Sequence, residues 1–111
     1  MSKNGGLDAR VVQAICSVLQ RYPQVSRAVL YGSRAKGTHA NGSDIDLCLY
    51  GDETLGIQIL HRILGELDDL LLPYSFDVQI YSDIQSEALL DHIRRVGKTL
   101  YARHDTSSAK P

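Results

Sequence analysis

Two aspartates and a glycine–serine pair stand close together in the first half of the sequence. Gly32-Ser33 follows an apolar run, and ten residues separate Ser33 from Asp44-x-Asp46. Both aspartates alternate with apolar residues, which is typical of a strand with both carboxylates on one face, roughly 6.6 Å apart along the chain. Carboxylate oxygens in that arrangement suit Mg²⁺. Two such ions, about 3.5–4 Å apart, would stabilise the attacking and leaving oxygens of a phosphoryl displacement.

The glycine–serine side of this unit is suited to a polyphosphate. Gly32 has no side chain, so backbone can approach a ligand closely. Ser33 offers a hydroxyl and is the predicted N-cap of a short helix over residues 33–36, whose free N–H groups would bind phosphate. Arg34 and Lys36 add positive charge beside it.

A third carboxylate lies in a later predicted strand, residues 76–81. There Asp77 and Gln79 share one face, opposite three apolar residues. If this strand lies beside residues 43–50, about 4.8 Å away, Asp77 completes a cluster of three carboxylates. The alternative is an edge strand with a solvated face. Asp83 is the rival third acid, but Ser82-x-x-Gln85 matches a capping box, which makes Asp83 a first-turn helix residue.

Each fragment is weak evidence when it is taken alone. A Gly-Ser turn is common, and Asp-x-Asp often marks a solvated strand. Their combination in one strand–turn–strand unit, with a third carboxylate on a candidate neighbouring strand, is far more specific. The sequence contains neither a Walker A loop nor a G-x-G-x-x-G fingerprint.

The segment 32–37 (GSRAKG), followed by 43–47 (SDIDL), resembles the nucleotidyltransferases of the DNA polymerase β superfamily. More narrowly, it is similar to the minimal nucleotidyltransferases (MNT) that form the antitoxin half of HEPN/MNT toxin–antitoxin pairs. The resemblance covers residues 25–81. Lys36 stands where many relatives carry Arg, a departure that keeps the positive charge.

This resemblance implies Mg²⁺-dependent transfer of AMP from ATP to a hydroxyl. It implies that phosphate-binding residues are Gly32, Ser33, Arg34 and Lys36. It implies that metal-binding and catalytic residues are Asp44, Asp46 and Asp77, with Asp77 as third ligand or as the base. The implied acceptor is a tyrosine of a cognate HEPN toxin, a helical ribonuclease, for which this chain would be the antitoxin.

Length and composition narrow the class of protein. With 111 residues, one domain is expected over residues 7–103, with flexible ends at 1–6 and 104–111. A net charge of −1 argues against binding nucleic acid through bulk electrostatics. The sequence shows no signal peptide and no apolar run of membrane-spanning length. Cys16 and Cys48 lack metal-binding spacing, so we expect reduced thiols in a cytoplasmic protein.

Hydrophobic periodicity predicts an α/β (α+β) fold with a small mixed β-sheet of three or four strands. Helices would pack on one face, and the acidic face opposite would be partly open. The predicted strands are 25–31, 43–50 and 76–81. The predicted longer helices are 7–22, 54–72 and 84–101.

Without further domains to grip an acceptor, the cleft would be shallow, and selectivity would come from a second chain, as a partner, a homodimer or a hetero-oligomer. Two other functions stay open. The chain could be a binding module that neutralises a partner by docking alone, or it could transfer nucleotide to a small-molecule hydroxyl, such as that of an aminoglycoside.

Overall fold

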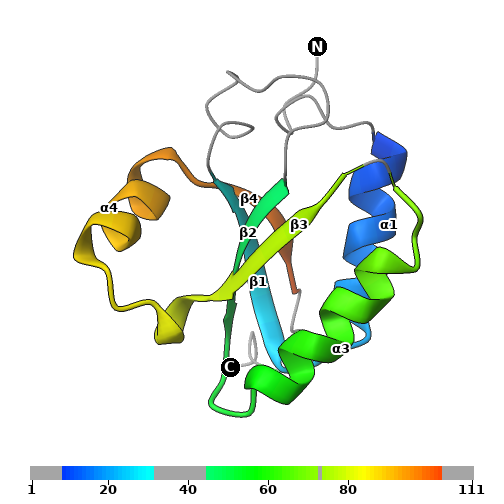
Figure 1. The fold of residues 1–111 in the computed structure, drawn as a ribbon, viewed down its shortest axis with the longest axis horizontal. Helices are drawn as coiled ribbons and strands as arrows, with labels where there is room; N and C mark the ends of the chain where they lie inside the picture. Colours follow the sequence, from blue (N-terminus) through cyan, green and yellow to red (C-terminus); the bar gives the residue numbers. More distant parts are fainter. Residues whose placement is uncertain (1–8, 32–44, 73, 104–111) are drawn as a thin grey trace, which may run out of the picture.

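A four-stranded sheet forms the centre of the molecule, with helices on both of its faces (Figure 1). The structure is a computed structural model that describes residues 9–31, 45–72 and 74–103. The strands are β1 (Val25–Tyr31), β2 (Ile45–Gly51), β3 (Phe76–Ile80) and β4 (Lys98–Ala102). The helices are α1 (Ala9–Gln20), α3 (Ile57–Asp68), α4 (Glu87–Val96) and the short 3-10 helix η1 (Tyr81–Asp83).

The sheet is mixed, as predicted. Its strand order is β3-β2-β1-β4, with β1 antiparallel to both β2 and β4 and β2 parallel to β3. A parallel pair needs a crossover connection, and α3 supplies it between β2 and β3. The central strands β1 and β2 are buried on both faces over residues 28–31 and 47–49, which explains why these two stretches are continuously apolar.

The helices α1 and α3 cover one face of the sheet. Their apolar stripes bury Ile15, Leu19, Ile63 and Leu67 against the inward side chains of the strands. The strand residues in this larger core are Val25, Ala28, Leu30, Ile45, Leu47, Leu49, Val78, Ile80 and Tyr101. This is the helix-covered face that the sequence predicts.

The helix α4 packs on the opposite face, so the acidic face is partly covered (Figure 1). There Ile93 of α4 contacts a smaller cluster formed by Val29, Tyr31 and Cys48 of the two central strands. Cys48 is buried and Cys16 half-buried, and neither is in a disulfide. Burial raises the pKa of both thiols, that of Cys48 to about 11, so they are protonated and unreactive at neutral pH.

The C-terminal region differs from the prediction, because the last helix ends at Val96 and a fourth strand follows. Leu100 and Tyr101 fit the helical spacing of α4, yet they belong to β4. Between the two elements, Gly97 is extended and so close to β1 that a Cβ would lie 2.4 Å from the Val29 side chain. Glycine therefore lets the chain turn against β1 and pair with it.

Two helix ends were also predicted wrongly. The capping serine of α4 is Ser86, whose hydroxyl accepts a hydrogen bond from the Leu89 amide at 3.2 Å, whereas Ser82 lies in η1. The helix α3 ends at Asp68 rather than Leu72. Leu71 has a φ of 56°, a left-handed conformation that an α-helix cannot continue.

A single arginine ties the end of the described chain to the start of the sheet. The Arg103 guanidinium donates to the carbonyls of Gln20 at 3.2 Å, Tyr22 at 3.1 Å and Val25 at 3.3 Å. These carbonyls belong to the end of α1 and the beginning of β1, where helical partners are missing. Arg103 thus joins α1, β1 and β4. Among the described residues, no helix is long and apolar enough to cross a membrane.

Replacing Arg103 by Met is expected to lower the free energy of unfolding by about 2 kcal/mol, because hydrogen bonds to a charged donor are lost from partly buried carbonyls. Urea titration measures this value. Arg95→Met is the matched control, since its exposed ion pair with Asp91, at 2.9 Å, is worth less than about 0.5 kcal/mol. An equal decrease in the free energy of unfolding for the two variants would contradict the proposed role of Arg103 in linking α1, β1 and β4.

Candidate active site

The carboxylates of Asp46 and Asp77 lie on neighbouring strands at the same level of the sheet. In the parallel pairing of β2 and β3, Asp46 and Asp77 are direct partners. The register is held at its start by a hydrogen bond from the Ile45 amide to the Ser75 carbonyl at 2.8 Å. The predicted adjacency of the two strands is therefore correct.

Both aspartates project on the α4 face of the sheet. Their neighbours along the strands, Ile45, Leu47 and Val78, belong to the core on the other face, and strand side chains alternate. Asp46 is half-buried and Asp77 is exposed on the edge strand β3. We call the residues Tyr31, Asp46 and Asp77 the acidic row, because Tyr31 of β1 is in turn the direct partner of Asp46.

The rest of the predicted site lies outside the described residues. This holds for Gly32, Ser33, Arg34, Lys36 and Asp44. The strands that flank this segment are described, and both meet at the acidic row: β1 ends at Tyr31 and β2 begins at Ile45. The rival acid, Asp83, lies in η1, beyond the far end of β3 from Asp77.

The donor set of the acidic row fits a small divalent ion. Two carboxylates on one face, about 4.8 Å apart between strands, can supply oxygen ligands to Mg²⁺, which takes one or two carboxylates plus phosphate and water. Within the described ranges, no group of three acidic, histidine or cysteine side chains gathers that could hold a metal. The third predicted carboxylate ligand is Asp44, and its metal role stays a prediction, as do those of Asp46 and Asp77.

Sequence reasoning assigned no functional role to Tyr31 of the acidic row or to His92 on α4. The ring of His92 on α4 meets the Tyr31 ring edge-on, with centroids 6.3 Å apart and an interplanar angle of 80°. Burial, together with the nearby charges of Asp77 and Asp46, raises the pKa of Tyr31 to about 12, so its hydroxyl is protonated at neutral pH. Alternation along β1 puts Tyr31 on the same face of the sheet as Val29, but only the fold shows that α4 covers this face.

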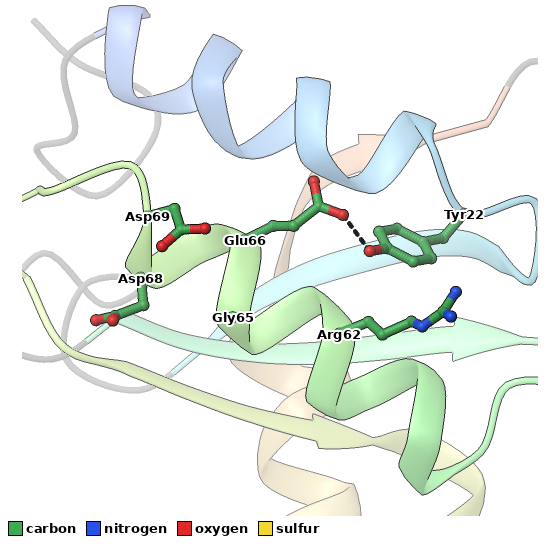
Figure 2. A pocket seen from close by; sticks show the side chains of 6 residues that line it. All are labelled: Tyr22, Arg62, Gly65, Glu66, Asp68 and Asp69. Atoms are coloured by element: carbon green, nitrogen blue, oxygen red, sulfur yellow. Dashed lines mark hydrogen bonds between the residues drawn. The ribbon is translucent and has the colours of Figure 1, made fainter.

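A hollow on the opposite side of the sheet contains none of these groups. It measures about 470 Å³ and is lined by Tyr22, Arg62, Gly65, Glu66, Asp68 and Asp69. Figure 2 shows Glu66 of α3 pointing at the Tyr22 hydroxyl, which donates to it, with Arg62 to one side and the two aspartates to the other. Arg21 also pairs with Glu66. The Glu66 carboxylate thus links α3 to the residues that follow α1, so we interpret its role in this hollow as structural.

The chain can be placed in a family once this geometry is known. Residues 13–106, most of the chain, match the family described as "Polymerase beta, Nucleotidyltransferase". This chain belongs to that family. No curated protein matches the sequence significantly.

Solved structures that resemble this chain include toxin–antitoxin complexes. One, a toxin–antitoxin with AMP-PNP, contains a chain with a TM-score of 0.69 and 22% identity, covering 88% of this chain and 78% of that one. A chain of an MntA-HepT complex has a TM-score of 0.66 and 18% sequence identity, and the match covers 92% of this chain and 79% of that one. A chain of a rebuilt structure of tri-AMPylated Shewanella oneidensis HEPN toxin with MNT antitoxin has a TM-score of 0.64 and 19% sequence identity, and the match covers 90% of this chain and 76% of that one. At this identity the likeness shows the nucleotidyltransferase fold.

Asp77→Asn is expected to stabilise the metal-free nucleotidyltransferase by about 0.5 kcal/mol, because it relieves repulsion between like charges on adjacent strands. Thermal unfolding in EDTA measures the effect. Asp83→Asn, a surface acid outside the row, should leave the melting temperature unchanged. A destabilised Asp77→Asn variant would mean that this carboxylate does not oppose folding.

Stability should also depend on pH through Glu66. The hydrogen bond from Tyr22, together with Arg21 and Arg62, lowers the pKa of Glu66 in the folded chain. A lowered folded pKa contributes stability above the unfolded pKa, about 4.3, and the contribution disappears as pH falls through the folded value. Wild type should therefore exceed Glu66→Gln in urea midpoint at pH 7, and the difference should shrink below about pH 4. A difference in urea midpoint that stays constant down to pH 3 would contradict a contribution from the ionised Glu66 carboxylate.

Proposed function

We propose that this nucleotidyltransferase transfers AMP from ATP to a protein hydroxyl, a tyrosine of a cognate HEPN toxin, and thereby acts as its antitoxin. The observation that carries the proposal is the alignment of Asp46 with Asp77 at the level where β1 and β2 meet residues 32–44. Membership of the nucleotidyltransferase family supports the reaction type. The complex of tri-AMPylated HEPN toxin with MNT antitoxin, a structure of the same fold, supports the acceptor.

The chemistry is a displacement at the α-phosphorus of ATP. The acceptor oxygen forms a new bond to that phosphorus, the bond to the bridging oxygen of the β-phosphate breaks, and pyrophosphate leaves. The hydroxyl proton passes to a base, for which Asp77 is placed on the exposed edge of the sheet. Asp44, Asp46 and Asp77 would hold Mg²⁺, which neutralises the charge of the phosphates and of the leaving group.

Phosphate positioning is assigned to the segment after β1. Gly32 and Ser33 would seat the β- and γ-phosphates through backbone N–H groups and the hydroxyl. Arg34 or Lys36 would neutralise phosphate charge. These residues are contiguous with Tyr31, the described end of β1 in the acidic row.

An acceptor on another protein is consistent with the position of Asp77. In the described part of the sheet β3 is an edge strand, and the Asp77 side chain is exposed there. A tyrosine presented by a second chain can therefore approach this carboxylate from outside the sheet. This geometry supports a heteromeric complex of enzyme and acceptor.

Removing Asp44 and Asp46 together is expected to lower nucleotide transfer by about 100-fold or more, because charge stabilisation at the phosphates is lost. The assay follows label from [α-³²P]ATP, with Mg²⁺, onto the HEPN-type partner, for wild type and for Asp44→Ala/Asp46→Ala. The matched control is Asp68→Ala/Asp69→Ala, an acidic pair that lines the hollow on the other side of the sheet. It should transfer label as wild type does.

Three results would contradict the proposal. Unchanged transfer by Asp44→Ala/Asp46→Ala would remove these aspartates from the reaction. Full neutralisation of the partner by that variant, with no label, would favour a module that acts by docking. Efficient labelling of a free small-molecule hydroxyl without the partner would favour a small-molecule nucleotidyltransferase.

A further inference from the structure

Two tyrosines and two arginines form a stack on the α4 face of the sheet, where η1 leads from β3 toward α4 (Figure 1). The rings of Tyr50 on β2 and Tyr81 in η1 are stacked, with centroids 4.4 Å apart and an interplanar angle of 22°. The Cζ atom of Arg27 on β1 lies 4.3 Å from the centroid of the Tyr50 ring. The Nε of Arg94 on α4 donates to the Tyr81 hydroxyl at 3.2 Å. We call these four residues the cationic stack.

The rings of the cationic stack are covered, while its guanidiniums face solvent. Because β2 lies between β1 and β3, Arg27 and Tyr81 approach the Tyr50 ring from its two sides. Both tyrosines are half-buried, and both arginines are exposed. A guanidinium that lies on a ring keeps the N–H groups at its edge for other acceptors, and Arg94 uses only its Nε on Tyr81. Each arginine can therefore still donate hydrogen bonds to an anion.

The arginines of the cationic stack are held by aromatic rings rather than by acids. Within the described ranges, no carboxylate forms an ion pair with Arg27 or Arg94. Asp91, one turn before the end of α4, pairs with Arg95 instead, at 2.9 Å. An arginine that is already oriented by an aromatic contact loses less conformational freedom when it binds a carboxylate. The stack thus presents two oriented cations to an anionic ligand.

The cationic stack and the acidic row lie at opposite ends of one face of the sheet. Arg27 and Tyr50 are direct partners across β1 and β2. Four residues along the same strands, Tyr31 and Asp46 are direct partners in the acidic row. At about 3.3 Å per residue the two groups are about 13 Å apart, and Ile93 of α4 packs on the residues between them. A protein that reaches the acidic row can contact the cationic stack as well, because an interface of standard size is wider than this separation.

We propose that the cationic stack is a docking site for an acidic segment of the acceptor protein, whose Asp or Glu side chains pair with Arg27 and Arg94. This inference rests on the proposed function, because it takes the acceptor to be a second protein. Charge complementarity carries it, since guanidiniums bind carboxylates through two parallel N–H groups and such pairs fix the orientation of docking. A nucleic acid fits the stack less well, because both faces of the Tyr50 ring are covered and cannot stack on bases.

The test measures the affinity of the full chain for its HEPN-type partner, without ATP, by isothermal titration calorimetry. We expect Arg27→Gln/Arg94→Gln to bind the partner about 10-fold more weakly than wild type, with an affinity that depends less on NaCl concentration. Arg95→Gln is the matched control, because it removes an exposed arginine of the same helix that lies outside the stack, and it should bind as wild type does. In the transfer reaction, KM for the partner should rise in the double variant while kcat stays unchanged.

The chemistry of the ligand is tested on the full chain alone, by fluorescence polarisation with two labelled probes, hexaglutamate and hexathymidylate. Hexaglutamate should bind more tightly, and Arg27→Gln/Arg94→Gln should remove the difference. Tighter binding of hexathymidylate to wild type, lost in the same variant, would make the stack a nucleic-acid surface and overturn the proposal.

A second variant covers the case in which the double variant folds poorly, as judged by its melting temperature. Arg94→Glu leaves Arg27 on the Tyr50 ring and replaces an exposed cation by an anion, so it should weaken partner binding too. Wild-type affinity in a folded variant of the stack, or an equal loss in Arg95→Gln, would overturn the docking site and leave the proposed function intact. A complex that weakens as expected but never carries label would overturn the proposed function alone. No complex between wild type and the partner would overturn both.

Discussion

The site depends on the parallel register between β2 and β3. Asp46 faces Asp77 only because Ile45 pairs with Phe76, and a slip by one residue would send one carboxylate to the opposite face of the sheet. The register is maintained by burial rather than by the acids. Leu47 and Leu49 on β2 and Val78 and Ile80 on β3 are locked in the core under α1 and α3. The hydrophobic face thus fixes the geometry of the acidic face.

Holding two like charges side by side opposes folding, and the structure shows what offsets it. The larger core lies under the strands that bear the acids. On the other face, α4 covers β1 and the middle of β2, while Asp77 stays exposed at the edge. The acidic row is therefore packed under α4 at Tyr31 and open to solvent at Asp77. Such conflict between local stability and a group of acids is expected at functional sites.

Much of this arrangement could be predicted from the sequence, because period-two alternation is a local signal. It placed β1 at its observed bounds, and it put Asp77 on the same face of its strand as Gln79 and opposite the apolar residues. What failed depends on tertiary contacts. Leu100 and Tyr101 continue the helical spacing of α4, and only the close approach of Gly97 to Val29 shows why the chain pairs with β1 instead.

The contact between Tyr31 and His92 could not be predicted for a similar reason. The two rings meet only because α4 packs on the face of the sheet that bears Tyr31, and the placement of a helix is not a local property of the chain. The start of α4 was misplaced because Ser82 and Ser86 both suit an N-cap, and the hydrogen bond to Leu89 decides between them. Expectations for residues 32–44 were specific, but these residues lie outside those the structure describes.

In the proposed function, this chain transfers a nucleotide, rather than a phosphate, to a partner protein at the acidic row. The most direct measurement incubates this chain and its HEPN-type partner with Mg²⁺ and with ATP labelled either at the α- or at the γ-phosphate. We expect label on a tyrosine of the partner from α-labelled ATP and no label from γ-labelled ATP. Label from the γ-phosphate, or no label from either ATP while the partner is silenced, would contradict nucleotide transfer as the activity.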